Sequence, residues 1–158
     1  MKRHVIEMLV IDEPGVMNRI TGMFSRRGYN IDTITVGKTQ KQGVSKIVFT
    51  LEADDETLYQ VEKQCDKLLD VIEIRELPEN SSFFREMCLA KFLVEKKDKE
   101  KIEGYVKKYG FEIISSGQNY IVIEMMAEPE KIGEFLKEMS NFKIEDISRT
   151  GITGISTR

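Results

Sequence analysis

A change from strand to helix is predicted by ten consecutive residues, Ile11-Asp12-Glu13-Pro14-Gly15-Val16-Met17-Asn18-Arg19-Ile20. Residues 4–11, which lead into this segment, are mostly apolar and β-branched, as is typical of a strand buried within a sheet. Pro14 is expected at the first helical position, because its missing N–H costs nothing there. The helix is expected to end at Gly28, since glycine readily takes the left-handed conformation of a C-cap. Its apolar face is predicted to consist of Val16, Ile20, Met23 and Phe24.

The rest of the first half completes a βαββαβ order. Strands are expected near residues 29–36, 44–53 and 71–77, and Asp54 is expected to cap a helix that precedes the last of them. Two helices over one face of a mixed four-stranded sheet form the ferredoxin-like arrangement. The single histidine, His4, lies at the start of the first strand and is expected at the surface.

The second half of the chain repeats this pattern. Its expected elements are a strand near 86–94, a helix from Asp98 to Gly110, a hairpin of strands 111–115 and 120–126, a helix from Pro129 and a strand near 142–149. The segment Arg26-Arg27-Gly28-Tyr29-Asn30-Ile31 also resembles Lys108-Tyr109-Gly110-Phe111-Glu112-Ile113. We therefore expect an α+β protein with two ferredoxin-like βαββαβ domains in tandem, at residues 1–77 and 85–158, joined by a linker at 78–84.

Each of these predicted domains is small for independent stability. A core of that size supplies roughly 3–5 kcal/mol. Pairing of sheet edges between the halves, or with another chain, would add stability and would cover exposed edge strands. A homodimer is therefore expected on physical grounds.

Composition excludes several classes of function. The 158 residues include 24 Lys+Arg and 27 Asp+Glu, a formal charge of −3, whereas general nucleic-acid binding needs a basic surface. One histidine and no Cys pair at ligand spacing give little support to a metal site or to a histidine-activated nucleophile. No apolar run reaches the ~20 residues of a membrane span, and no signal peptide is expected. Cys65 and Cys88 are expected to be buried free thiols of a cytoplasmic protein.

The predicted junction of strand, turn and helix has the outline of an amino-acid site. The first amides of a helix, here those of Gly15 and Val16, carry partial positive charge and suit a carboxylate. Asp12 can accept a hydrogen bond from an ammonium group, and Asn30 offers both a donor and an acceptor. The pattern alone favours a structural role, in which Pro14-Gly15 only starts the helix and Asp12 helps to cap it.

A resemblance favours the ligand-binding interpretation. The motif Asp12-Glu13-Pro14-Gly15-Val16, joined to the βαββαβ order, resembles the ACT domain, a module that binds small ligands, usually amino acids, at paired domain interfaces. The longer run from Asn18 to Ile31 is similar to the small regulatory subunit of acetohydroxyacid synthase (acetolactate synthase). The similarity is strong over residues 5–77 and looser over 85–155. It includes Thr35-Val36, Ile47, Glu62-Lys63-Gln64, Lys67-Leu68, Asp70-Val71, Arg85-Glu86-Met87 and Ser148-Arg149-Thr150-Gly151-Ile152.

The resemblance implies a regulatory subunit with no catalytic residues, metal or cofactor of its own. Such a subunit binds a larger catalytic subunit that carries thiamine diphosphate, Mg²⁺ and FAD. It raises the activity of that subunit and makes it sensitive to feedback by a branched-chain amino acid, usually valine. The effector is expected between the ACT domains of a homodimer. The residues carried over to this effector site are Asp12, Gly15, Val16, Met17, Asn30 and Ile31, with Met17 and Ile31 contacting the aliphatic side chain.

Two departures from the family pattern affect these expectations. Family members usually have Asn at the position of Asp12, where an anion favours a ligand ammonium group but repels a nearby carboxylate. The second half lacks the D-x-P-G motif, and it has Tyr109-Gly110-Phe111 and Ser115 where the family tends to have an Arg-Gly pair and an acidic residue. No effector is therefore expected in the second domain, which the resemblance assigns to engaging the catalytic subunit.

The same fold also serves other functions. A stand-alone amino-acid sensor would use the same pocket without a catalytic partner. An RNA-binding sheet needs exposed aromatics in an R-G-F-G-F-type strand, which residues 43–49 do not supply. An acylphosphatase-like hydrolase needs an arginine in a glycine-rich phosphate loop, whereas Asp12 and Glu13 in this loop would repel phosphate.

Overall fold

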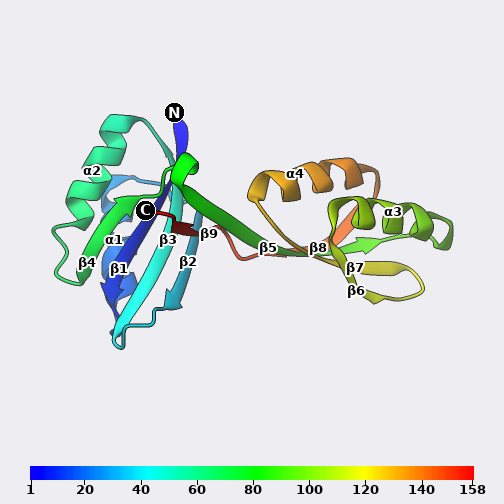
Figure 1. The fold of residues 1–158 in the computed structure, drawn as a ribbon, viewed down its shortest axis with the longest axis horizontal. Helices are drawn as coiled ribbons and strands as arrows, with labels where there is room; N and C mark the ends of the chain where they lie inside the picture. The colour runs from blue at the N-terminus through cyan, green and yellow to red at the C-terminus, as the bar shows by residue number, and fades with distance from the viewer. The chain divides into compact units, whose positions relative to one another are not determined.

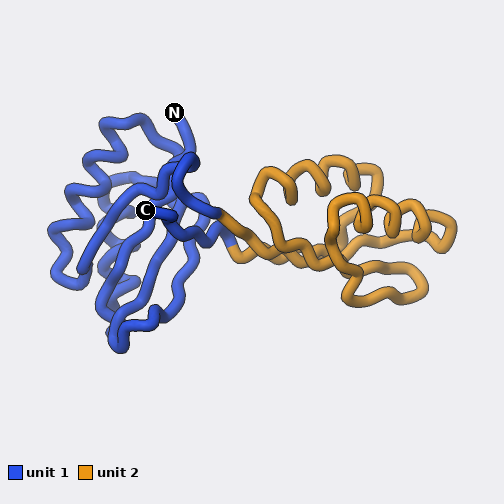
Figure 2. Tube along the Cα trace, viewed as in Figure 1, with its two compact units in different colours: residues 1–83, 151–158 blue, residues 84–150 orange.

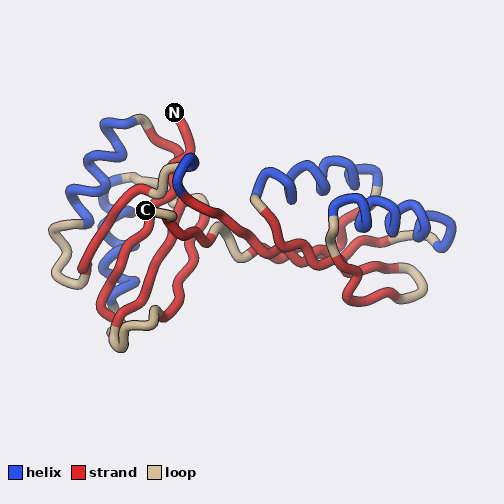
Figure 3. Tube along the Cα trace, in the orientation of Figure 1, coloured by secondary structure: helices blue, strands red, loops and turns tan.

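The computed structural model describes residues 1–158 and divides them into two compact units (Figure 2). Unit 1 contains residues 1–83 and 151–158, and unit 2 contains residues 84–150. Each unit combines a sheet with α-helices (Figures 1 and 3), α1 and α2 in unit 1 and α3 and α4 in unit 2. No helix is long and apolar enough to cross a membrane.

Unit 1 has the expected βαββαβ order. Its elements are β1 (Lys2–Ile11), α1 (Val16–Arg27), β2 (Thr33–Lys38), β3 (Val44–Ala53), α2 (Asp55–Cys65), β4 (Val71–Glu76), the 3₁₀ turn η1 (Glu79–Ser81) and, at the chain end, β9 (Thr153–Ser156). The strands lie in the order β2-β3-β1-β4. The helices α1 and α2 cover one face of this sheet (Figure 1).

The sheet of unit 1 is antiparallel at every pairing, so the prediction of a mixed sheet is wrong. The cause lies in the order of the strands. Strands β1 and β2 point the same way but are separated by β3, and β3 and β4 are likewise separated by β1. No two neighbouring strands are therefore parallel.

The helix α1 buries the face that the sequence predicts. Its buried residues are Val16, Ile20, Met23 and Phe24. They pack on Ile6, Met8, Ile47 and Phe49 from the two central strands, and the rings of Phe24 and Phe49 meet edge to face with centroids 5.1 Å apart. The helix ends at Gly28 with φ 70°, in the expected left-handed C-cap.

His4 is buried, contrary to the prediction. Its ring lies on the helix side of β1, and Nδ1 is 2.6 Å from Oε1 of Glu76 on β4. Because this partner lies far along the chain, the local sequence around His4 could not reveal it. Cys65 and Cys88 are free and buried, as expected, and burial raises the pKa of the Cys65 thiol to about 12.

Unit 2 repeats the architecture with its own core. Its elements are β5 (Ser82–Leu93, which begins in unit 1), η2 (Lys96–Asp98), α3 (Lys99–Tyr109), β6 (Glu112–Ser116), β7 (Tyr120–Ala127), α4 (Pro129–Glu138), η3 (Met139–Asn141) and β8 (Lys143–Arg149). The strand order β6-β7-β5-β8 corresponds to that of unit 1. An aromatic cluster of Tyr109, Phe111 and Phe135 fills the space under the helices.

The last eight residues lie apart from the rest of the predicted second domain. Residues 151–158 are grouped with unit 1, whereas the sequence placed them in the domain 85–158. The segment 78–84, expected as a linker, contains η1 and the first residues of β5. The chain end is held by hydrogen bonds of threonine side chains and by the pairing of β9 with β5, which no hydrophobic periodicity reveals.

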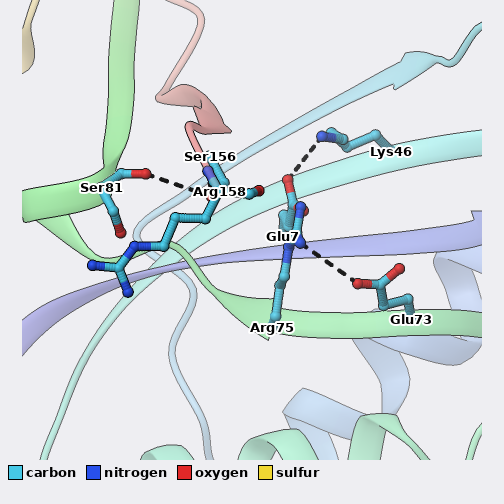
Figure 4. A network of polar contacts seen from close by, with 7 residues as sticks. All are labelled: Glu7, Lys46, Glu73, Arg75, Ser81, Ser156 and Arg158. Carbon is cyan, nitrogen blue, oxygen red and sulfur yellow. Dashed lines mark hydrogen bonds and ion pairs between the residues drawn. The ribbon is translucent and has the colours of Figure 1, made fainter.

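A buried carboxylate lies on the helix-free face of the unit 1 sheet. Glu7 on β1 is only 3% exposed. It accepts hydrogen bonds from Lys46 Nζ at 2.8 Å and from Arg75 Nε at 2.5 Å, so cations from β3 and β4 flank it (Figure 4). The same view shows Ser156 of the chain end, whose hydroxyl donates to the carbonyl oxygen of Ser81.

Replacing Glu7 is expected to destabilise unit 1. Glu7→Ala leaves two cations without their carboxylate, and both retain partial access to water, so we expect a loss of about 2–3 kcal/mol, below the full cost of breaking a buried pair. Urea denaturation followed by circular dichroism measures it. Glu73→Ala is the control, because Glu73 is half-exposed and 3.8 Å from Arg75, and its loss should stay below about 1 kcal/mol. Equal losses in the two variants would contradict the interpretation.

Candidate functional site

The turn between β1 and α1 is tied to neighbouring loops through its backbone. The amide of Ile11 donates to the carbonyl oxygen of Asp70, and the amide of Asp12 donates to that of Gly43, both at 2.9 Å. The side chain of Asp12 is exposed, and its Oδ2 lies 4.0 Å from Lys38 Nζ. The position of Asp12 at the strand end is therefore fixed by the backbone, while its carboxylate remains accessible.

The helix α1 begins later than the sequence predicts. Val16, not Pro14, is the first helical residue, and Gly15 is the N-cap, with φ 87° in the left-handed region. Glu13 and Pro14 precede this cap and form a turn in which the amide of Val16 donates to the carbonyl oxygen of Glu13 at 3.4 Å. The expectation that proline occupies the first helical position is wrong, because the reversal of the chain requires the positive φ that glycine supplies.

The start of α1 carries amide donors without acceptors. No side chain caps the helix, and its first turn contains no acidic residue. The amide of Val16 is used within the turn, whereas those of Gly15, Met17 and Asn18 have no intramolecular partner. The sequence analysis expected the amides of Gly15 and Val16 to be free donors. In the structure the amide of Gly15 is free, that of Val16 is not, and those of Met17 and Asn18 are free as well. Free amides at a helix N-terminus favour an anion.

The apolar residues of the predicted site, Val16, Met17 and Ile31, pack wholly or partly in the core of unit 1. Val16 is 3% exposed and belongs to the core of unit 1, so its side chain is not available to a ligand. Met17 and Ile31 are half-buried and pack against the same core, so each keeps part of its surface accessible. These two residues offer apolar contact beside the polar turn.

Asn30 and Ile31 precede β2 instead of starting it. The strand begins at Thr33, four residues later than the expected start at residue 29. Asn30 is exposed, and its Nδ2 donates to Asp32 Oδ1 at 3.4 Å. This hydrogen bond points within the loop and not to the β1–α1 turn.

Arg19 is a cation beside the turn that the site prediction did not include. Its Nε and Nη2 donate to the carboxylate of Asp70 at 2.5 and 3.0 Å. Its Nη1 lies so close to Gly15 that a Cβ added there would be 3.0 Å away. The guanidinium therefore adds positive charge next to the free amides. Its partner is distant in sequence, and only the resemblance drew attention to Asp70.

The β1–α1 turn and the segment before β2 carry groups of the kinds that recognise an α-amino acid. Free amides and the Arg19 guanidinium suit a carboxylate. Asp12 supplies an anion for an ammonium group, with Lys38 as its nearest cation. Met17 and Ile31 supply apolar surface. The structure shows all of these groups in unit 1 and shows no ligand contact between them.

Two family models cover nearly the whole chain. The model described as "AHAS small subunit-like ACT domain" matches residues 6–73. The model described as "Small subunit of acetolactate synthase" matches residues 85–158. The first match includes the β1–α1 turn and the segment before β2.

Curated relatives and a solved structure agree with these matches. The chain is 35% identical to the "Probable acetolactate synthase small subunit" of Methanothermobacter thermautotrophicus, over 97% of this chain and 92% of that one. It is 33% identical to the "Acetolactate synthase small subunit" of Bacillus subtilis, over 99% and 91%. The crystal structure of the acetolactate synthase small subunit from Thermotoga maritima superposes with a TM-score of 0.91 at 33% identity, over 99% and 98% of the two chains.

The pairing of Arg19 with Asp70 predicts a pH-dependent contribution to stability. The hydrogen bonds from Arg19 hold the pKa of the Asp70 carboxyl below its ordinary value. A lowered folded-state pKa adds stability that is complete above the unfolded pKa of about 4 and is lost as the pH falls through the folded value. The urea midpoint of the unmodified protein should therefore exceed that of Asp70→Asn by a constant amount from pH 5 to 8. The difference should shrink below about pH 4, and a difference that persists unchanged at pH 3 would contradict this assignment.

Proposed function

Since the chain belongs to the family of acetolactate synthase small subunits and carries the ACT domain of that family, we propose that it is a non-catalytic regulatory subunit. It activates the catalytic subunit of acetohydroxyacid synthase and confers feedback inhibition by a branched-chain amino acid, valine first. The support is the match of both family models, which together span the β1–α1 turn and the second domain. In this proposal residues 1–77 bind the effector and residues 85–158 engage the catalytic subunit.

The catalytic chemistry is assigned to the partner. The relatives are named as small subunits of acetolactate synthase, which implies a larger subunit that performs the reaction. Thiamine diphosphate, Mg²⁺ and FAD would be bound there. The task of this chain is then to bind that subunit and to change its activity when an effector is present.

The single observation that carries the effector site is the uncapped start of α1. The amides of Gly15, Met17 and Asn18 lack acceptors, and Arg19 lies against Gly15. The carboxylate of valine accepts hydrogen bonds from these donors, and its ammonium group donates to Asp12. The isopropyl group contacts Met17 and, across the dimer interface, Ile31.

A homodimer through the ACT domains is part of the proposal. Strand β2 pairs only with β3, so its other edge has unpaired backbone groups. An open edge is a ready template for pairing with a second chain. Asn30 and Ile31 directly precede this edge strand, so a second copy paired there brings the two sites to the interface. Occupancy then depends on how the two chains are placed, which allosteric control requires.

A stand-alone amino-acid sensor remains the alternative. It would use the same turn and would need no second domain. The match of residues 85–158 to the small-subunit family favours the regulatory subunit, because this part contains no second D-x-P-G motif and has no sensing role in the proposal.

Reconstitution with the catalytic subunit of the same organism tests the proposed function. We expect the chain to raise acetolactate formation about fivefold or more, and valine to reverse much of this gain, as coupling free energies of 1–3 kcal/mol produce. The assay measures acetolactate with and without the chain over a range of valine. Binding of valine without any effect on the catalytic subunit, and without co-purification, would instead support the sensor.

Substitution of Gly15 tests the effector site. In Gly15→Asp the new carboxylate competes for the free amides and for Arg19, and it repels the carboxylate of valine. Calorimetry should show valine affinity reduced at least about 30-fold, a loss of about 2 kcal/mol, while activation of the catalytic subunit persists.

A matched control separates this effect from backbone strain. Gly110 has the same left-handed conformation, with φ 70°, and nothing lies within 4 Å of an added Cβ. Gly110→Asp therefore imposes a similar strain in unit 2 and should leave valine affinity unchanged. Unaltered affinity in Gly15→Asp would refute the site assignment.

A further inference from the structure

The chain end covers the helix-free face of the unit 1 sheet. Ile152 is 3% exposed, and on the face opposite the helices Val48 and Thr50 of β3 are 2% and 1% exposed although no helix covers them. Strand β9 lies beside β3 (Figure 1). We call residues 151–158 the strap, because they lie across this face as a single extended segment.

The strap is held at its start by two threonines of β2. The hydroxyl of Thr35 donates to the carbonyl oxygen of Ile152 at 3.1 Å, and the amide of Ile152 donates to Thr33 Oγ1 at 3.5 Å. Gly151 has φ 85°, and a Cβ added to it would be 3.0 Å from Thr33 Cβ. The first residues of the strap therefore fit closely against β2.

The far end of the strap is held by η1. The amide and the hydroxyl of Thr157 both donate to the carbonyl oxygen of Ser81, at 2.9 and 3.1 Å. The strap thus spans from β2 to the segment that leads into β5. Its contacts at both ends are hydrogen bonds within unit 1.

The residues immediately before the strap are fixed in unit 2. The amide of Thr150 donates to the carbonyl oxygen of Met87 at 3.0 Å, and Thr150 Oγ1 accepts from the amide of Met87 at 3.1 Å. Arg149 forms two hydrogen bonds of 2.7 Å to Glu86, which is buried. Thr150 is hydrogen-bonded to β5, and the next residue, Gly151, packs on β2. No residue lies between these two contacts.

The same part of β2 is connected to the proposed effector site. Thr33 follows the loop that contains Asn30 and Ile31. The amide of Asp32 in this loop donates to the carbonyl oxygen of Thr50, whose hydroxyl lies 2.9 Å from Thr33 Oγ1. A movement of the loop that contains Asn30 and Ile31 would therefore displace Thr33, which holds the strap.

The order of the strands makes the strap the shorter of the two routes from β2 to unit 2. The chain leaves unit 1 through β4 and η1, and β4 is at the opposite edge of the sheet from β2. Through the sheet itself, a change at β2 would have to cross β3 and β1 to reach that exit, whereas the strap, whose strand β9 pairs with β5, bypasses this path. The strap instead joins β2 directly to Thr150.

We propose that the strap transmits effector occupancy from the ACT domain to unit 2 through the contacts of Thr33 and Thr35 with Ile152. This inference rests on the proposed function and adds the route of its regulation. The effector binds one arrangement of the loop before β2 better than another, and that difference in affinity shifts how the strap is held. Unit 2 responds because its strand β8 continues into the strap.

The double variant Thr33→Val/Thr35→Val tests the route. Valine has nearly the shape of threonine but lacks the hydroxyl, so both strap contacts are lost, while the packing of β2 is retained. In calorimetry with the isolated protein, the affinity for valine should stay within about twofold of the unmodified protein. In the reconstituted holoenzyme, inhibition at saturating valine should weaken about fivefold or more, the size of a typical allosteric coupling, with activation retained.

Thr39→Val is the matched control. The hydroxyl of Thr39 donates to Lys41 and Val44 carbonyl oxygens in the hairpin after β2 and does not contact the strap. This variant should keep full inhibition by valine. Urea midpoints of all three proteins show whether the double variant remains folded.

Hydrogen exchange on the unmodified protein gives a second measurement that needs no variant. Saturating valine should change the exchange rate of a peptide that covers residues 150–157. Full inhibition in the double variant, or no change in exchange of this peptide, would overturn the strap while leaving the proposed function intact. Absence of valine binding to the unmodified protein would overturn the proposed function and this inference with it.

Discussion

The left-handed turn at Gly15 is the constraint on which the candidate site depends. With φ 87° this residue reverses the chain between β1 and α1 and directs Val16 into the core. Because glycine performs the turn, no Ser, Thr or Asp side chain occupies the N-cap, where it would satisfy the first amides. The helix dipole therefore ends at free donors. The same short turn places the guanidinium of Arg19, one turn into the helix and paired with Asp70, against the glycine, so a cation lies beside the free amides.

The sequence predicted the helix faces and the order of helices and strands along the chain well, because both follow from local periodicity. The apolar stripe of α1 and the C-caps at Gly28 and Gly110 are present as expected. The predictions that failed depend on residues far apart in the chain. His4 is buried because Glu76 on another strand meets its ring. The sheet is antiparallel throughout because of which strands become neighbours, which periodicity within one strand does not determine.

The residues of the candidate site show the same difference between local and long-range signals. Asp12, Gly15, Met17, Asn30 and Ile31 could be named because a short motif and a resemblance include them. Arg19 was within the motif, but its role depends on Asp70, which lies 51 positions further along the chain. Similarly, Thr33 and Thr35, which hold the strap, are in sequence only the polar face of an alternating strand, and nothing local indicates their contacts with Ile152. Hydrogen bonds between polar side chains of distant segments leave no periodic signal in a sequence.

The contacts on the two sides of the junction between Thr150 and Gly151 differ in strength, and this difference determines where the chain can move. In unit 2, the chain before the strap is held by a bidentate Arg149–Glu86 pair with a buried carboxylate, and charge-assisted pairs of this kind are the stronger class of hydrogen bond. On β2, the strap is held by threonine hydroxyls at 3.1 and 3.5 Å, and neutral bonds contribute about 1 kcal/mol each. A change of a few kcal/mol therefore releases the strap from β2 before it separates the strap from unit 2. Movement at β2 with a firm attachment to β8 is the arrangement that allows a small ligand in one unit to act on the other.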